Sequence, residues 1–329
     1  MTAAAVAAFA SRLALLAVAA VLAPLTLQAQ TYPSQPIRLI VPFGAAGSPN
    51  TIARLVAEKL ADDIGKPVVV ENKAGASGKI AASEVAHASP DGHTLMFASE
   101  GVYAVVPAFY SDLNYDPKAG FAPIIHVARG DMFLVVNSKL GVNSLAEFIA
   151  LAKSQPGIIN YGTPGIATIH HLGMAHLQAL AGLSLMHVPY RGLVQGTPAL
   201  LANEVSVMFA ALPSIAQYVE DGRLKILAVA SLQRAARLPQ VPTIAELGFP
   251  GFQIPTNVGF LAPAGTPKPI IEQLNKTISA GLTTPKVSNL MNATGYATVG
   301  GAPEVFDRQI REDQDVYTNL VRETGVKPQ

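Results

Sequence analysis

The sequence Pro42-Phe43-Gly44-Ala45-Ala46-Gly47-Ser48-Pro49-Asn50, called the first turn below, follows the apolar stretch Ile37–Val41 and precedes a run with helical spacing of apolar residues. This pattern predicts a buried strand, a bare turn and a helix from about Pro49 to Ile64. Ser48 before Pro49 favours a helix start, because the hydroxyl can cap free amides and the ring already holds a helical φ. The unpaired amides and the positive end of the helix dipole predict an anion site, which carboxylate and phosphate both fit.

An ordinary strand-to-helix turn would explain the same nine residues equally well. They match neither GxGxxG nor GxxxxGK[ST], so neither a dinucleotide nor a nucleoside triphosphate is indicated. However, the segment Gly162–Thr168, called the second turn, repeats the design: it follows the strand predicted over 158–161 and precedes a helix predicted over 168–180. The repetition favours an anion site. Another polar, glycine-rich segment, Glu71–Gly78, also joins a predicted strand to a predicted helix.

Short apolar strands alternate with helices through most of the chain, which is typical of parallel sheets covered on both faces. The pattern breaks at residues 103–120, which we expect to be irregular, and at the long apolar segment 124–136, which is interrupted at Arg129-Gly130-Asp131. We interpret that segment as a crossing between two lobes, with a bulged strand as the alternative. Thr197-Pro198 predicts another helix start, and a last helix, Pro303–Glu323, is expected to return to the first lobe.

Composition limits the classes of function. The chain has 329 residues, of which 50% are hydrophobic and 14% charged, enough for well-filled cores. It has no Cys, which excludes a disulfide framework and thiol chemistry. The 23 basic residues nearly balance the 22 acidic ones, so no basic surface suggests a nucleic-acid partner.

Residues 1–29 have the composition of an export signal. They hold one charge, Arg12, then a run of apolar residues from Leu13 to Leu27 and a small residue at Ala29. We predict a signal peptide that is cleaved after Ala29. A membrane anchor is the alternative, although the apolar run is short for a span.

Evidence for catalysis or metal binding in the sequence is weak. His170, His171 and His176 do not share one face of a helix and have no acidic neighbours, which disfavours a metal site. There is no GxSxG elbow and no pair of carboxylates in the loops, so we expect no catalytic residues and no cofactor. His170 could donate a hydrogen bond to a bound anion, or it could only cap the start of its helix and pack against its neighbours. Arg191 could form a forked pair of hydrogen bonds to a carboxylate, or it could be an ordinary surface arginine.

Eight fragments of the chain, in this order and at this spacing, carry a resemblance to a known family. They are Tyr32–Phe43, Ala53–Leu55, Val68–Ala76, Pro90–Leu95, Tyr161–Gly165, Val188–Gly192, Val241–Thr243 and Ala262–Pro267. Together they resemble the substrate-binding (Bug) proteins of tripartite tricarboxylate transporters, over nearly all of the chain that follows the predicted signal peptide.

The resemblance implies an α/β, two-lobed periplasmic-binding-protein (Venus flytrap) fold, with a central sheet covered by helices in each lobe. The expected lobes are residues 30–128 with 254–329, and residues 129–253. Such a protein is periplasmic and monomeric, closes on a small organic carboxylate and delivers it to two membrane components. An exported enzyme or a sensory co-receptor that uses the same cleft is the alternative.

In this family the two turns would face each other across the cleft and grip the carboxylate, partly through ordered waters, with Val188–Gly192 lining the second lobe. The predicted ligand-binding residues are Phe43, Gly44, Ala45, Ala46, Gly47, Ser48, Asn50, Ser99, Gly162, Thr163, Gly165, Ile166, Ala167, Thr168, His170, Tyr190, Arg191, Gly192 and Ser206.

Two of these residues depart from the family pattern. The family usually has Asp at the position of Asn50 and commonly has Asp at the position of Ser206. Both changes remove a negative charge, which predicts a cleft less suited to a ligand with an amino group and more suited to a purely anionic or partly apolar acid. The family's aromatic residue near Val258 is also missing.

Overall fold

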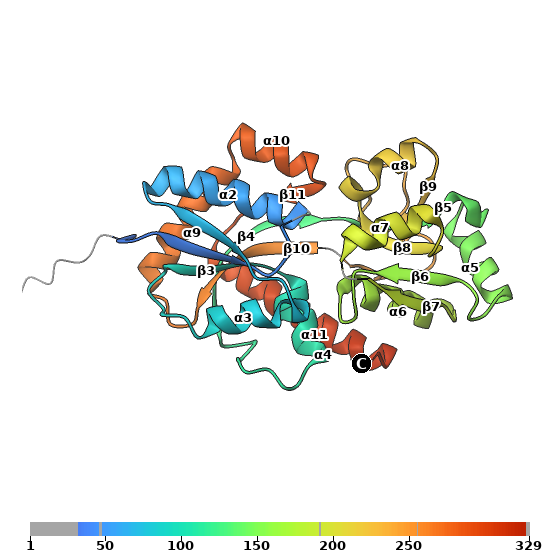
Figure 1. Cartoon of the computed structure of the whole chain (residues 1–329), viewed down its shortest axis with the longest axis horizontal. Coiled ribbons are helices and arrows are strands. Elements are labelled where there is room, and N and C mark those ends of the chain that lie inside the picture. Colours follow the sequence, from blue (N-terminus) through green and yellow to red (C-terminus); the bar gives the residue numbers. More distant parts are fainter. Residues whose placement is uncertain (1–31, 46–47, 191, 255, 327–329) are drawn as a thin grey trace, which may run out of the picture. The chain divides into compact units, whose positions relative to one another are not determined.

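The computed structural model describes residues 32–45, 48–190, 192–254 and 256–326. The predicted signal peptide lies outside the described residues, as do Ala46, Gly47 and Arg191 of the predicted site. The described residues from Gln35 onward form one compact unit that holds two β-sheets with helices on their faces (Figure 1). The predicted α/β class with two covered sheets is confirmed.

The first sheet has the strand order β11-β4-β10-β3-β1-β2. β1 is parallel to β2 and β3, and β10 is antiparallel to both β3 and β4. The bounds of these strands are Ile37–Val41 for β1, Val68–Asn72 for β2, Thr94–Ser99 for β3, Phe121–Gly130 for β4, Thr256–Pro263 for β10 and Tyr296–Thr298 for β11.

Helices on both faces cover this sheet, and Figure 1 shows α2 and α3 on opposite sides of it. The apolar spacing that predicted α2 is the face that it buries, with Ile52, Leu55, Val56 and Leu60 in the core. The helical segments are η1 (Ala76–Gly78), α2 (Ser48–Ile64), α3 (Lys79–Ala86), η2 (Gly101–Val105), α4 (Val106–Phe109), α9 (Lys268–Leu282), α10 (Pro285–Ala293) and α11 (Pro303–Thr324).

The second sheet has the order β7-β6-β8-β5-β9. β6 is parallel to β7 and β8, whereas β5 is antiparallel to β8 and β9. Its elements are β5 (Met132–Asn137), η3 (Ser138–Leu140), α5 (Leu145–Ser154), β6 (Asn160–Thr163), α6 (Ile169–Ala181), β7 (Met186–Pro189), α7 (Leu193–Ala202), β8 (Val207–Ala211), η4 (Leu212–Ser214), α8 (Ala216–Glu220) and β9 (Leu224–Val229).

The chain changes sheets inside the segment that was predicted as a crossing. Gly130 pairs with Thr256 and Tyr296 in the first sheet, whereas Met132 pairs with Ala211 in the second. The change therefore falls at Asp131. The lobe boundaries expected after residues 128 and 253 remain predictions.

Two local expectations were wrong. Residues 103–109 are not irregular, because β3 leads directly into the helical turns of η2 and α4. The helix expected to start at Thr197-Pro198 starts at Leu193, so that Pro198 lies inside α7. The earlier start is seen in the backbone, because the amides of Gln195 and Gly196 both donate to the carbonyl of Gly192. A Cβ on Gly196 would lie 2.8 Å from Cε of Met208 in β8, so the first turn of α7 packs closely against this strand.

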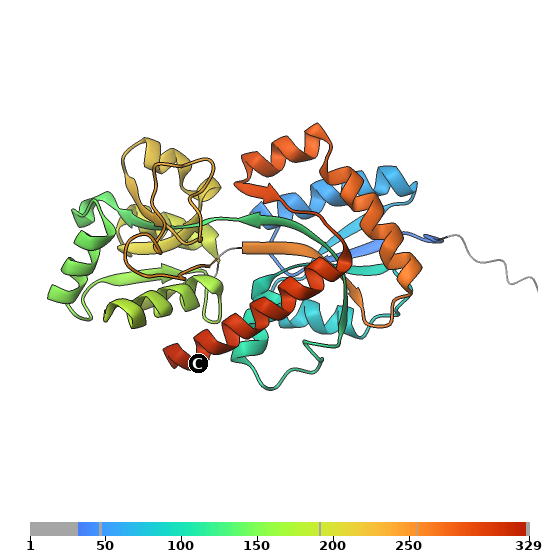
Figure 2. The ribbon, with the colours of Figure 1, turned by 180° about the vertical axis from the view of Figure 1, so that it is seen from behind.

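The last helix, α11, was expected over 303–323 and is present at Pro303–Thr324. It packs on β4, η2 and α4, as its predicted return to the first lobe requires, and also reaches α6 (Figure 2). Every third or fourth residue of α11 is buried, including Phe306, Ile310 and Tyr317. The helix thus contacts elements attached to both sheets.

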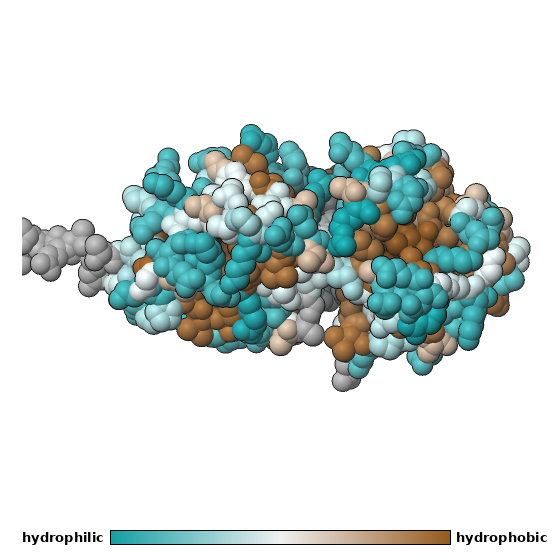
Figure 3. All heavy atoms as spheres, turned by 90° about the horizontal axis from the view of Figure 1, so that it is seen from above, coloured by the Kyte–Doolittle hydropathy of each residue, from teal (hydrophilic) through white to brown (hydrophobic). Residues whose placement is uncertain are grey.

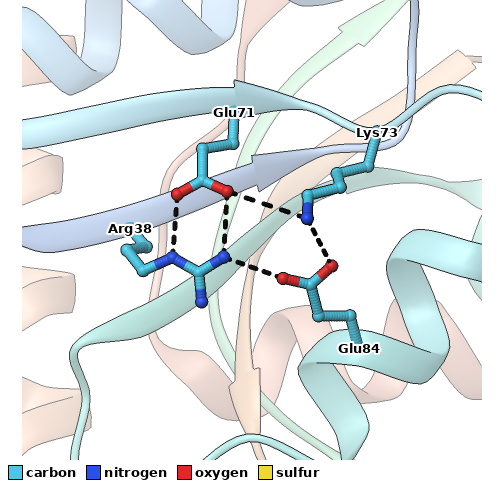
Figure 4. A network of polar contacts seen from close by, with 4 residues as sticks. All are labelled: Arg38, Glu71, Lys73 and Glu84. Carbon is cyan, nitrogen blue, oxygen red and sulfur yellow. Dashed lines mark hydrogen bonds and ion pairs between the residues drawn. The ribbon is translucent and has the colours of Figure 1, made fainter.

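A network of four charged side chains joins β1, β2 and α3 (Figure 4). Arg38 makes two hydrogen bonds to Glu71, of 2.8 and 2.9 Å, and one of 2.8 Å to Glu84. Lys73, just beyond β2, lies 2.9 Å from Glu84. The bond to Arg38 lowers the pKa of Glu71, and Lys73 lowers the pKa of Glu84. Because all four are partly exposed, each pair stabilises the fold by about 1 kcal/mol or less, but together they fix the end of β2.

Two buried carboxylates lie on either side of Asn257, at the start of β10. The backbone N–H of Asn257 donates to Glu100 Oε2 at 2.6 Å, and its side-chain amide donates to Asp313 Oδ2 at 3.2 Å. The hydroxyl of Tyr103 also donates to Asp313, at 2.9 Å. Burial, and then the charge of Asp313, raises the pKa of Glu100 well above its usual value of 4.5.

Glu100 should make the stability of the protein depend on pH. From pH 4.5 upward to its raised pKa, the folded protein keeps a proton that the unfolded chain releases, so the free energy of unfolding falls as pH rises. Glu100→Gln keeps an acceptor for the amide of Asn257 and cannot ionise, so its free energy of unfolding should fall less over this window. Urea unfolding at pH 5, 7 and 9 measures the difference.

The exposed Glu272→Gln is the control for this prediction and should unfold with the same pH dependence as the natural sequence. Parallel curves for Glu100→Gln and the natural sequence would contradict the prediction.

Candidate functional site

Two asparagine side chains donate hydrogen bonds to backbone carbonyls of the first turn. Asn50, 3% exposed, donates to the carbonyl of Ala45 at 2.7 Å and accepts from the side chain of Asn72 at 2.7 Å. Asn72, at the end of β2, also donates to the carbonyl of Phe43 at 3.0 Å. The carbonyls of Ala45 and Phe43 in this turn therefore each have a side-chain donor. Direct contact of Asn50 with a ligand remains a prediction.

The identity of Asn50 matters for this arrangement, because its side-chain amide donates to one partner and accepts from another at the same time. An aspartate at this position would offer acceptors only, so the carbonyl of Ala45 would lose its donor. Arg54 completes the arrangement by donating to Oδ1 of Asn72 at 2.8 Å.

Residues 74–78, called the third turn, lie beside the first. Gly75, Ala76, Ser77 and Gly78 all have positive φ, of 137°, 46°, 54° and 95°. For Ala76 and Ser77 this conformation costs on the order of 1 kcal/mol each, and such strain concentrates at functional sites. A Cβ on Gly78 would lie 2.7 Å from Val102 and 3.3 Å from Pro42, so only glycine allows this packing against the first turn.

The third turn was not among the predicted site residues. Its position could have indicated a role in the site, because it is a glycine-rich turn at the carboxyl end of β2, and β2 is parallel to β1. β3 is the other parallel neighbour of β1, so the predicted Ser99, its last residue and buried, lies at the same edge. The structure thus brings Phe43, Gly44, Ala45, Ser48 and Ser99 to one edge of the first sheet.

The second turn lies at the carboxyl end of β6, before α6. Thr168 caps α6: its hydroxyl accepts from the amide of His171 at 3.4 Å and donates to the carbonyl of Gly165 at 2.8 Å. Gly165 has φ 143° and Ala167 has φ 55°. The expected helix start after Thr168 is confirmed.

Two backbone bonds attach the segment after β7 to the second turn. Tyr190 donates to the carbonyl of Thr163 at 2.9 Å, and Gly192 donates to the carbonyl of Pro164 at 3.1 Å. β7 is parallel to β6, so both strands end at this edge. Seven other predicted site residues therefore lie together with Thr163: Gly162, Gly165, Ile166, Ala167, Thr168, Tyr190 and Gly192.

Ser206 does not join this group. Its amide and hydroxyl both bond to Oδ1 of Asn160, at 2.9 and 3.0 Å. Asn160 is the first residue of β6, and the parallel register pairs Tyr161 with Val207. Ser206 thus lies at the amino-terminal end of these strands, roughly 10 Å along β6 from the second turn. A sequence pattern could not separate the two ends because the strand has only four residues.

His170 lies in the first turn of α6, and both its ring nitrogens are shielded from solvent without a hydrogen-bond partner. Burial lowers the pKa of His170 to about 4, so the imidazole is neutral at pH 7. It offers one N–H donor and no charge. The two alternatives for His170, donation to an anion or packing alone, both remain open.

A hydrogen bond links the two sheet edges. The hydroxyl of Ser77, in the third turn, donates to the carbonyl of Ile166, in the second turn, at 3.5 Å. The rings of Phe109 from α4 and His171 from α6 also stack, with centroids 6.5 Å apart. Turns attached to the two sheets are therefore neighbours.

A separate hollow of about 350 Å³ lies along the edge strand β9, with Val219, Leu224 and Ile226 in its lining. Figure 3 shows apolar surface on the face that carries α8 and β9. This hollow shares no residue with the predicted site. Within the described ranges, no group of three or more His, Cys, Asp or Glu side chains could hold a metal ion.

The two covered sheets, between which the chain passes at Asp131, define a periplasmic-binding-protein fold. The model of the "Tripartite tricarboxylate transporter family receptor" matches residues 52–326. The chain belongs to this family, and the resemblance predicted from the sequence is confirmed. In the described part of the chain, no helix is long and apolar enough to cross a membrane.

Three solved structures are similar over most of the chain. An R. palustris protein solved with adipate is 31% identical with a TM-score of 0.84, covering 91% of this chain and 100% of that one. The periplasmic binding protein BugD is 32% identical with a TM-score of 0.81, and the coverage is again 91% and 100%. MatC from Rhodopseudomonas palustris with bound malate is 29% identical with a TM-score of 0.80, covering 88% and 100%.

The hydrogen bonds that Asn72 donates to Asn50 and to the carbonyl of Phe43 can be tested by removing its side chain. Asn72→Ala leaves the buried Oδ1 of Asn50 and the carbonyl of Phe43 without their donor, and should lower the free energy of unfolding by about 1–3 kcal/mol. Chemical denaturation measures the loss.

Asn319→Ala is the matched control, because Asn319 is exposed and bonded to Arg322. It should change the free energy by roughly 0.5 kcal/mol or less. Equal effects of the two substitutions would argue against a stabilising role for the hydrogen bonds of Asn72.

Proposed function

We propose that this protein is an extracytoplasmic solute-binding protein that captures a small organic carboxylate between the first and second turns. The observation that carries the proposal is the contact between Ser77 and Ile166, which makes turns from the two sheets neighbours. The third turn, which holds Ser77, packs in turn on Pro42 of the first.

Backbone amides and helix dipoles supply the affinity for an anion. α2 and α6 have 17 and 13 residues, and the first amides of each have no partner within the helix. The dipole at each amino terminus favours a negative charge by about 0.3–1 kcal/mol. Two helices that point at one carboxylate therefore both favour its negative charge. The relatives solved with adipate and malate support this class of ligand.

Function then follows from differential affinity and includes no catalytic step. Residues 30–128 with 254–329 form one lobe, and residues 129–253 form the other. The ligand touches both lobes only when they are closed, so it shifts the equilibrium toward the closed state. Released from its signal peptide into the periplasm, the protein works as a monomer and delivers the carboxylate to the membrane components of a tripartite tricarboxylate-type transporter.

A thermal-shift screen tests the proposal with mono-, di- and tricarboxylates, including adipate, malate and aromatic acids. At least one should raise the melting temperature with concentration, as a stabilisation of RT ln(1 + [L]/Kd) requires, and should be recovered unchanged afterwards. No shift with any acid, or turnover of the acid, would overturn the proposal.

Gly165→Val should abolish this shift, because a β-branched side chain at φ 143° strains the second turn and blocks its backbone. Gly141→Val is the matched control: Gly141 also has a positive φ, of 78°, with open space around it, and it follows η3 rather than a predicted binding turn. The control should carry a similar cost in stability and keep the shift. Equal ligand responses in both variants would argue against the assigned turn.

Asn50 should influence selection against amino groups. We expect the natural sequence to bind succinate more tightly than aspartate and glutarate more tightly than glutamate. Asn50→Asp adds a negative charge beside the first turn and should reduce or reverse this preference. Calorimetric titration of the four acids measures it, and tighter binding of the amino acids by the natural sequence would refute the expectation.

A further inference from the structure

We infer that His187 is a positioning residue for the second turn and acts through the hydroxyl of Thr163. The inference rests on the proposed function for the role of that turn, and it assigns the turn a support that the sequence did not indicate. His187 lies in β7, and its Nε2 is 2.7 Å from Oγ1 of Thr163, the last residue of β6. Thr163 is fully buried.

The hydroxyl of Thr163 connects His187 to the backbone of Gly165. Oγ1 donates to the carbonyl of Gly165 at 3.1 Å and accepts from the amide of Gly165 at 3.3 Å. A hydroxyl has only one proton, so when Thr163 donates to that carbonyl it must accept from His187. This geometry requires a proton on Nε2 of His187.

The ring of His187 is held by aromatic neighbours on both sides. It stacks on His171 with centroids 4.0 Å apart and on Tyr161 with centroids 4.8 Å apart. Phe109 stacks on His171 in turn. Burial lowers the pKa values of both histidines, that of His171 to about 4, which keeps the stacked pair neutral at pH 7.

The consequence for a ligand lies in the orientation of the peptide groups of the turn. The carbonyl of Gly165 accepts from the hydroxyls of Thr163 and Thr168, at 3.1 and 2.8 Å. With its carbonyl bonded to these hydroxyls, the turn keeps one arrangement at the amino terminus of α6, where free amides remain for an anion. Pre-organisation of this kind saves the ligand the cost of ordering the turn.

Two substitutions separate the hydrogen bond from the ring packing. His187→Gln keeps an N–H donor at about the same reach but removes the ring. His187→Phe keeps a ring for the stack but has no donor. Amide hydrogen exchange of residues 162–168, measured without ligand, should be about five-fold faster in His187→Phe and near the natural rate in His187→Gln, because one hydrogen bond is lost only in the former.

Thr163→Val removes the acceptor and keeps His187, so it should reproduce the faster exchange, while Thr163→Ser should restore the natural rate. Because Thr163→Val also removes both hydrogen bonds to Gly165, its exchange should be at least as fast as that of His187→Phe, and the double variant Thr163→Val/His187→Phe should exchange no faster than Thr163→Val alone. ¹⁵N NMR of the natural protein should show the neutral tautomer with the proton on Nε2.

His176→Phe is the matched control. His176 also stacks on an aromatic ring, Phe252, with centroids 5.1 Å apart, and lies roughly 10 Å along α6 from the start of the helix. It should leave exchange of the second turn unchanged. If some carboxylate shifts the melting temperature of the natural protein, its affinity should fall about five-fold in His187→Phe and stay near the natural value in His187→Gln.

Fast exchange in His187→Gln with natural exchange in His187→Phe would mean that ring packing holds the turn, and would overturn the inference. Natural exchange in both His187→Phe and Thr163→Val, or a proton on Nδ1, would overturn it as well. The exchange experiment contains no ligand, so a failed carboxylate screen refutes the proposed function and leaves this test intact.

Discussion

The geometry of parallel strands is the constraint on which this site depends. Parallel neighbours end at the same edge of a sheet, and each then passes through a turn into a helix whose first amides have no partner. β1 and β2 bring two such turns to one edge of the first sheet, where β3 leads directly into η2, and β6 and β7 bring two segments to one edge of the second. Backbone alone can therefore form most of a site for an anion.

Such bare turns would be loose without support, and short polar side chains give it in both sheets. Asn50 and Asn72 bond the carbonyls of Ala45 and Phe43 in the first turn. Thr163 and Thr168 do the same for Gly165 in the second turn. With these carbonyls held, the orientation of the neighbouring peptide groups is restricted before any ligand arrives.

The region where strands cross between the sheets is fixed differently, by buried polar groups. Asn257 lies one residue from the start of β10 and is bonded to both Glu100 and Asp313. Burial raises the pKa values of both acids, and the nearby charge of Asp313 raises that of Glu100 further. The acids attach β10 to η2 and α11, and α11 continues to α6. The buried acids therefore link β10 to the helix that contacts elements attached to both sheets.

The sequence by itself determined the order of the elements, the crossing near Asp131 and the two glycine turns, because the apolar period of a strand or helix and the backbone freedom of glycine are local properties. It also gave the family, through short motifs spread over the chain. Only the tertiary structure decided which end of a short strand Ser206 occupies, that Asn50 is bonded beneath its turn, and that the third turn belongs with the first. Those facts depend on strand register and on packing between residues far apart in sequence, such as Ser77 with Ile166, which no local pattern encodes.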